Sequence, residues 1–144
     1  MKRLTADGSF KGMFNRLWEY TVRREKAAKA AKRRRKEEIE DGEFIVSKKA
    51  LADATLISES VLKHLCSSAD ETMRTSRDNV IALCLAMKLP PDYTERLLAS
   101  AGYSLGYGKR DKIIREHMET RKGQVHFLRL DLINAGEDDL VLSD

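Results

Sequence analysis

Proline, cysteine and aromatic residues are scarce in this chain, and their scarcity narrows the choice of fold. The only two prolines, Pro90 and Pro91, are adjacent, and 6% of the residues are aromatic. A core must therefore come mainly from Leu, Ile, Val, Ala and Met carried on helices. No alternating β-branched run reaches strand length, and the fragment at residues 44–46 is interpreted as an apolar lead-in to a helix. We expect an all-α protein.

Long apolar runs and targeting signals are also lacking. No stretch approaches the roughly 18 apolar residues of a membrane span, and no apolar core follows the Lys2-Arg3 pair. We therefore expect a cytoplasmic protein without a membrane partner. Two cysteines, Cys66 and Cys84, cannot define a disulfide framework and are interpreted as free thiols. At 144 residues the chain is long enough to bury a core without disulfides or metal.

Motifs of catalysis and cofactor binding are missing too. The three histidines lie far apart, and no spacing in the sequence supplies a metal-ligand set. Neither a nucleophile elbow nor a phosphate-binding loop occurs. Three glycines between residues 102 and 108 are explained better as a helix stop and a turn than as a nucleotide cradle. We expect no enzymatic activity, no cofactor and no metal.

Residues 47–65 carry the caps and the apolar spacing of two short helices. Ser47 and Ser58 stand where N-capping residues would start each helix. Apolar residues then recur at helical spacing, at Ala50, Leu51, Ala54, Val61, Leu62 and Leu65. Small residues at 52 and 54 permit a close crossing, as in the helix-turn-helix of DNA-binding proteins. An ordinary helical hairpin is the alternative, and periodicity does not distinguish the two.

Five further helices are predicted from periodicity and punctuation. The first covers residues 14–24, and an amphipathic helix at residues 76–87 begins at Ser76 and ends before the two prolines. The next covers residues 91–101 and stops at Gly102. The last two cover residues 109–119 and 125–135.

This order of motifs resembles the Xre/Cro-like family of bacterial and phage helix-turn-helix regulators. The family's pattern in the helix pair is matched by Ser47, Leu51, Ala52, Ile57 and Ser58. Its later helix end is matched by Leu83, Leu85, Ala86, Met87, Leu89 and Pro90. The stretch TERLLASAGYSL at residues 94–105 is similar to the end of the fifth helix in one subgroup, which is the more specific signal.

The resemblance covers residues 47–134 and the helix at 14–24, and it implies a five-helix core that binds DNA through the second helix of the pair. The chain departs from the family at two positions. Leu56 stands where the family has Gly or Asn to accept a positive φ, so we expect a reshaped or mildly strained turn. Glu59 stands where a neutral or basic side chain is usual, and it would repel phosphate unless it accepts from a cytosine amino group.

The excess positive charge of the chain is concentrated in one segment. Residues 23–36 hold nine basic residues and one acidic residue, whereas the remainder carries 18 basic and 22 acidic ones. Alanines within the run favour helix, so it can extend the first helix into a basic rod, which the family does not have. A solvated charged spacer is the alternative. The functional interpretation is phosphate contact, and RNA stays open as a ligand because arginine-rich helices fold into its groove.

Site residues follow from these two features. The expected base contacts lie on the second helix of the pair: Ser58, Glu59, Ser60, Lys63 and His64. The expected phosphate contacts lie at the start of the first helix of the pair and in the basic run: Lys48, Lys49, Arg23, Arg24, Lys32, Arg33, Arg34, Arg35 and Lys36. Any single lysine among these is more often an ordinary surface charge.

We divide the chain into an N-terminal helix with its basic extension (1–46), a helix-turn-helix core (47–105) and a C-terminal helical pair with an acidic tail (106–144), all in one folded unit. The helix at 125–135 is more apolar than one packing face requires, so it either closes the core or meets a second copy in a homodimer. The acidic residues at 137–139 are expected to be solvated.

The sequence therefore predicts a sequence-specific duplex DNA-binding protein that regulates transcription in a bacterium or phage. The alternative is an adaptor that keeps the fold and binds RNA or an acidic protein through the basic helix.

Overall fold

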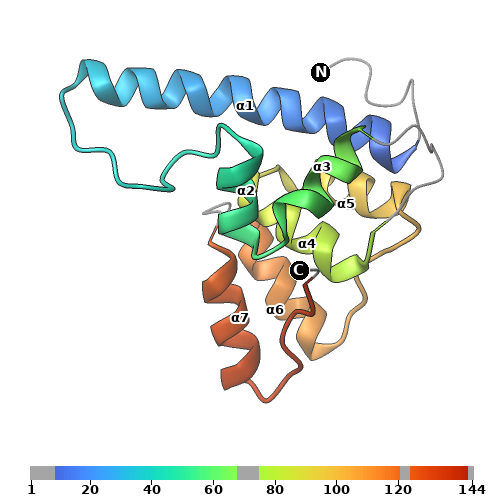
Figure 1. Ribbon diagram of the computed structural model, residues 1–144. Coiled ribbons are helices and arrows are strands. Elements are labelled where there is room, and N and C mark those ends of the chain that lie inside the picture. Colours follow the sequence, from blue (N-terminus) through green and yellow to red (C-terminus); the bar gives the residue numbers. More distant parts are fainter. Residues whose placement is uncertain (1–8, 68–74, 121–123, 143–144) are drawn as a thin grey trace.

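Seven helices and no strand make up the residues that the computed structural model describes, which are 9–67, 75–120 and 124–142 (Figure 1). The prediction of an all-α protein is confirmed for this part of the chain. The helices, in chain order, are α1 (Phe10–Arg34), α2 (Lys48–Thr55), α3 (Glu59–Ser67), α4 (Arg77–Ala86), α5 (Pro91–Ser100), α6 (Lys109–Thr120) and α7 (Val125–Asn134).

Helix α4 lies at the centre of the core. Its residues from Asn79 to Ala86 are all buried, and α2, α5, α6 and α7 each pack against it. A helix that is apolar on every side must be enclosed by others. The prediction that residues 76–87 form an amphipathic helix was therefore right about the helix and wrong about its exposure.

Helix α1 has two halves with different surroundings. The first half packs against α3 and α5, and the buried residues of α1 recur at helical spacing: Phe10, Met13, Phe14, Leu17, Thr21 and Glu25. The second half carries the basic run and projects beyond the other helices (Figure 1). The basic residues at 23–34 thus extend the first helix, as one of the two interpretations of this run predicted.

The chain then returns toward the core through residues 35–47, hereafter the return loop. Gly42 has a φ of +77° in this loop. Ile45 is 3% exposed and joins the hydrophobic core, while residues 44–46 form no strand. The fragment is therefore an apolar lead-in to α2, as predicted.

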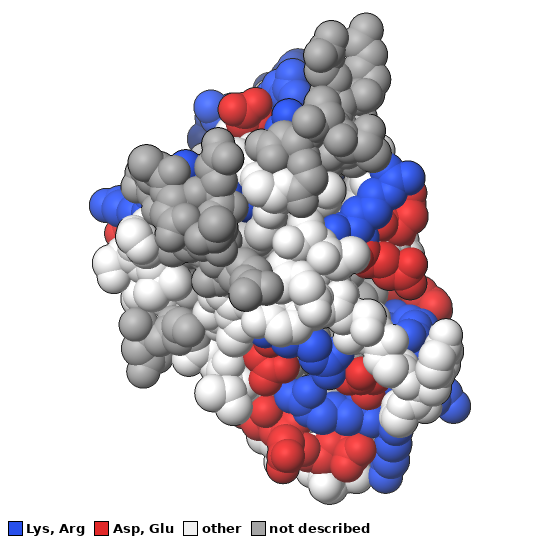
Figure 2. Space-filling view, turned by 90° about the vertical axis from the view of Figure 1, so that its right-hand side faces the viewer, with Lys and Arg blue, Asp and Glu red and all other residues white. Residues whose placement is uncertain are grey.

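Acidic and basic side chains alternate on part of the surface away from the tip of α1. Figure 2, which views the molecule from the right-hand side of Figure 1, shows both signs interleaved over the lower part of that face. Such a surface has no strong field of one sign.

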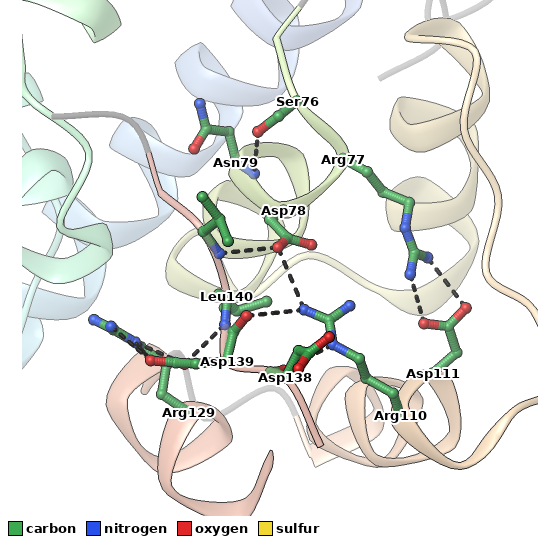
Figure 3. Close-up of polar contacts among 11 residues, drawn as sticks. Ser76, Arg77, Asp78, Asn79, Arg110, Asp111, Arg129, Asp138, Asp139 and Leu140 are labelled. Atoms are coloured by element: carbon green, nitrogen blue, oxygen red, sulfur yellow. Dashed lines mark hydrogen bonds and ion pairs between the residues drawn. The ribbon is translucent and has the colours of Figure 1, made fainter. Parts of the chain in front are cut away.

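Several of these charges hold the last described residues in place (Figure 3). Arg129 donates two bonds from Nε and one from Nη2 to the carboxylate of Asp139, and Arg110 donates to the carbonyl oxygens of Asp138 and Asp139. Leu140 is buried at 4% exposure. The expectation of a solvated acidic end was therefore wrong for Asp139, because the chain turns at residue 136 and folds back onto the helices.

A neighbouring ion pair joins α4 to α6. Arg77 donates to both carboxylate oxygens of Asp111, at 2.6 and 3.2 Å (Figure 3). The Gly106 N–H donates to the same carboxylate. Burial works to raise the pKa of Asp111, but the bonds from Arg77 and Gly106 outweigh it and lower that pKa overall. This pair fixes the start of α6 against the start of α4.

The two cysteines are free thiols in the structure, as predicted. Cys84 is buried in α4, and burial raises its pKa to about 12. Within the described residues, no helix combines the length and the apolarity needed to cross a bilayer.

Candidate nucleic-acid interface

Helices α2 and α3 pack against each other and are joined by residues 56–58. The Ser47 hydroxyl accepts from the Ala50 N–H at 3.1 Å, and the Ser58 hydroxyl accepts from the Val61 N–H at 3.3 Å. Both predicted caps are therefore present. Each satisfies a backbone donor of the first turn that has no partner within its helix.

The turn between these helices places Leu56 in a left-handed conformation. Its φ is +66° and its ψ is 15°, and its N–H donates to the Ala52 carbonyl at 2.8 Å. The side chain is 53% exposed. Of the two expectations for this turn, a reshaped backbone or mild strain, the second is the one observed, because a non-glycine residue keeps the positive φ and bears its steric cost of about 1 kcal/mol.

Thr55 and Ile57 fix this turn from inside. The Thr55 hydroxyl donates to the Leu51 carbonyl at 2.8 Å and accepts from the Ile57 N–H at 3.2 Å. Both side chains are buried, so the turn cannot shift without disrupting the packing of the core. Sequence reasoning missed Thr55. Its position four residues after Leu51 was the available signal, since a helical threonine can bond back to that carbonyl.

The outer face of α3 presents three of the predicted base contacts. Leu62 and Leu65 point into the core, whereas Ser60, Lys63 and His64 are exposed. These three positions lie on one side of the helix, because residues three and four apart share a face. We call them the α3 row.

The other two predicted base contacts have local roles. Ser58 caps α3 and lies 3.3 Å from the Ser60 hydroxyl. Glu59 is partly buried, and its carboxylate lies 3.9 Å from the Lys63 ammonium. Exposed pairs of this kind contribute less than about 1 kcal/mol, so Lys63 can exchange Glu59 for another acceptor.

At the start of α2, Lys49 is exposed and Lys48 is partly buried. Lys49 lies 4.0 Å from Asp53 one turn later. Both lysines stand beside the N-terminus of α2, as predicted, where an anion is favoured electrostatically.

The projecting half of α1 carries a row of exposed cations along one side, which we call the arm row: Arg23, Lys26, Arg33 and Arg34. Alanine 30 lies between them on the same side at helical spacing. None of the four takes part in an ion pair within the described part of the chain. Lys36, just beyond α1, is also exposed and has a φ of +58°.

Three predicted phosphate contacts are engaged inside the molecule instead. Arg24 donates to the Met87 carbonyl at the end of α4 and lies over the Tyr20 ring, so it was wrongly placed in the phosphate set. Lys32 pairs with Glu43 of the return loop, and Arg35 pairs with Glu37 at 2.5 Å. The contacts of Lys32 and Arg35 arise because the return loop places acidic residues beside the end of the helix.

Two acidic residues of the return loop, Glu37 and Glu43, have lowered pKa values beside the basic helix. The hydrogen bond from Lys32 lowers the pKa of Glu43, and the hydrogen bond from Arg35 lowers the pKa of Glu37. They compensate part of the positive charge at the end of α1 and leave the arm row uncompensated.

Glu25 is a further residue that sequence reasoning missed. It is 3% exposed, its carboxylate lies 3.1 Å from the Lys88 ammonium, and it accepts from the Ile45 N–H at 3.3 Å. It therefore ties the base of the projecting half to both the end of α4 and the return loop. Its spacing of four residues from Thr21 on the buried side was the available signal.

No group of three or more metal-ligating side chains occurs among residues 9–67, 75–120 and 124–142. In comparisons with known proteins, no protein-family model, no curated protein and no solved structure matches this chain.

Proposed function

We propose that this protein binds duplex DNA in a sequence-specific manner and regulates transcription in a bacterium or phage, with α1 to α5 as an Xre/Cro-like core. One observation carries the proposal: α3 has a buried apolar side, an exposed polar row, and a short fixed turn that joins it to α2. A helix of this kind fits the major groove and exposes donors and acceptors to base edges.

The α3 row supplies the base-reading groups in this proposal. Lys63 donates to the acceptors of guanine, and Ser60 and His64 contact neighbouring base edges. When Lys63 leaves Glu59, the carboxylate becomes available to a cytosine amino group. The pair is thus compatible with reading a G·C step, although Glu59 alone would repel phosphate.

The arm row supplies contacts that do not depend on sequence. Its four exposed cations lie along one side of a rigid helix, an arrangement that suits a phosphate backbone. Each neutralised phosphate releases counterions, so affinity falls as salt rises. Lys48 and Lys49 add phosphate contacts at the start of α2.

The test compares two double variants in selection from a random duplex pool and in salt titration. Lys63→Ala with His64→Ala is expected to change the enriched sequence, with a loss of about 1–3 kcal/mol of discrimination at the affected base pairs. Arg33→Ala with Arg34→Ala is expected to keep the enriched sequence, weaken all duplexes alike and reduce the salt slope by about one per contact.

The matched control removes the same charge elsewhere. Arg96 and Lys112 are exposed on α5 and α6, helices that carry neither row, and their double alanine variant should leave the salt slope unchanged. Equal losses on every sequence from the α3 and arm variants would refute the division of roles.

A second candidate is an adaptor that binds RNA or an acidic protein through the arm row. The observation in its favour is that Glu59 and Asp53 already pair with the lysines of α3 and α2, while the arm row has no such partners in the described chain. It predicts equal affinity for RNA and duplex DNA of any sequence, and no effect of the Lys63 and His64 substitutions.

A further inference from the structure

The projecting half of α1 has a second side, opposite the arm row, which we call the inner side. Helix positions advance by about 100° per residue, so Lys32 lies within about 20° of the buried Thr21 and Glu25, three and two turns earlier. By the same count, Arg23 lies roughly opposite Lys32, and the other cations of the arm row lie roughly 100° or more from it. The inner side therefore continues the core-facing side of α1 beyond the core.

The return loop places carboxylates on this side. The Glu43 carboxylate lies 2.5 Å from the Lys32 ammonium, and the two side chains are only 27% and 22% exposed. Arg35, five turns after the buried Leu17, pairs with Glu37 in a more exposed position. Figure 1 shows the loop running back beneath the projecting half before it enters α2. Both carboxylates thus stand where phosphate oxygens would bind these two cations.

Glu43 is held in place by the loop itself. The carboxylate oxygen that does not face Lys32 accepts from the Glu40 N–H at 3.2 Å, and the Glu43 N–H donates to the Glu40 carbonyl at 3.2 Å. Gly42 supplies a positive φ inside this turn, and Ile45 is anchored in the core two residues later. A carboxylate that is already fixed loses less conformational freedom on pairing than a mobile surface side chain does. The Lys32–Glu43 pair is therefore better placed to persist than an ordinary surface ion pair.

We propose that the return loop is an internal competitor for phosphate: its carboxylates occupy Lys32 and Arg35, so that a polyanion reaches the arm only along the arm row. A phosphate binds Lys32 only by displacing Glu43, whose charge then has no partner. The inference rests on the proposed function, because it concerns the regulation of the phosphate contacts proposed there. It adds a role for the acidic loop.

The salt dependence of binding distinguishes an occupied cation from an available one. Each cation that neutralises a phosphate releases counterions and steepens the fall of affinity with salt. Because Lys32 is occupied by Glu43, it should contribute nothing to this slope in the parent. Removal of the Glu43 charge should add the contribution of Lys32.

The test measures the affinity of the full chain for inorganic polyphosphate at several salt concentrations. This flexible polyanion can contact both sides of a helix, whereas duplex DNA is stiff over the length of the arm. We expect Glu43→Gln to bind polyphosphate more tightly than the parent at low salt. The slope of log affinity against log salt should be steeper by roughly 0.7–0.9, the contribution of one cation.

Glu38→Gln is the matched control, because it removes the same charge from the same loop. Glu38 is exposed and takes part in no ion pair within the described residues. It should raise the affinity slightly through the change in net charge and leave the slope unchanged. Circular dichroism checks that both variants keep the helical content of the parent.

Lys32→Ala, made in two backgrounds, tests whether Lys32 is the cation concerned. It should leave the salt slope of the parent unchanged and should abolish the gain in the Glu43→Gln background. A general disturbance of the loop by Glu43→Gln would not depend on Lys32 in this way. Equal slopes in Glu43→Gln and Glu38→Gln, or a shallower slope on Lys32→Ala in the parent, would overturn the proposal.

A duplex of random sequence, measured beside polyphosphate, separates this inference from the proposed function. If the parent binds no duplex while the variants differ on polyphosphate as expected, DNA binding is contradicted and the role of the loop is supported. If the parent binds duplex while Glu43→Gln and Glu38→Gln have equal slopes on polyphosphate, the role of the loop is overturned and DNA binding stands. Failure of Glu43→Gln to bind polyphosphate at low salt would also overturn the role of the loop.

Discussion

Leu56 illustrates at the scale of one residue how this fold tolerates local strain. A leucine with a φ of +66° is unusual, and its side chain is too exposed to recover the cost through burial. The conformation persists because Thr55 and Ile57 fix the turn on either side of it.

Replacing Leu56 by glycine should therefore stabilise the protein. Glycine adopts positive φ without strain but loses more backbone entropy on folding, so we expect a net gain of about 0.5–1 kcal/mol in the free energy of unfolding. Urea unfolding followed by circular dichroism measures it. Ile57→Gly, at a buried neighbouring position, should instead destabilise the protein. A loss of stability in Leu56→Gly would mean that the leucine side chain contributes more than its exposure suggests.

Asp139 connects pH to the attachment of the last described residues. The hydrogen bond from Arg129 is the main cause that lowers its pKa, and the Leu140 N–H adds to it against the effect of burial. A carboxylate whose pKa is lower in the folded state stabilises that state above its unfolded pKa of about 3.9, and the stabilisation disappears as the pH falls through the folded value.

Asp139→Asn should consequently be less stable than the parent at pH 7 and equally stable at the lowest pH at which both still fold. Thermal unfolding across acidic pH measures the convergence. The same offset between the two proteins at neutral and at acid pH would show that the carboxylate charge is not the cause.

Which single residues could be predicted depended on the distance to their partners along the chain. Ser47 and Ser58 were correctly predicted as caps because their partners lie three residues away. Arg24 and Glu25 were not, since their partners at residues 87 and 88 lie 63 positions later. Local patterns contain no information about such contacts.

At the scale of elements, α1 combines two surfaces on one helix. Its first half belongs to the core, and its second half carries the arm row beyond the core. Glu25 stands at the boundary, where it holds the end of α4 and the return loop to α1.

Glu25→Ala should loosen this boundary. The substitution removes the acceptor of the buried Ile45 N–H and the carboxylate that pairs with Lys88. We therefore expect the free energy of unfolding to fall by about 2 kcal/mol. Hydrogen exchange should rise in the return loop while the α2–α3 turn keeps its protection. Glu25→Gln retains an acceptor and should lose less. Equal exchange in the return loop of parent and alanine variant would contradict the role of Glu25.

Helix α4 shows that the periodicity of apolar residues does not predict how much of a helix is buried. The start and end of this helix followed from Ser76 and the two prolines. Its enclosure on every side did not, because the pattern of its own residues does not indicate how many helices will surround it.

At the scale of the whole molecule, the seven helices of the described residues place the α3 row and the arm row on separate elements. The order and type of the helices were predictable, because each has its own apolar spacing and stop signals. The position of the arm relative to α3 was not, since it depends on how α1 packs against α3 and α5. The same limit applied to residues 137–139, whose attachment depends on Arg110 and Arg129.

Selection of the unmodified chain against a random duplex DNA pool at physiological salt is the decisive measurement for sequence reading by α3, because phosphate contacts alone bind weakly there. Sequence reading by α3 predicts enrichment of one motif. A bound pool with no enriched sequence would contradict DNA reading by α3 and would leave only phosphate contacts, from the arm row and from Lys48 and Lys49.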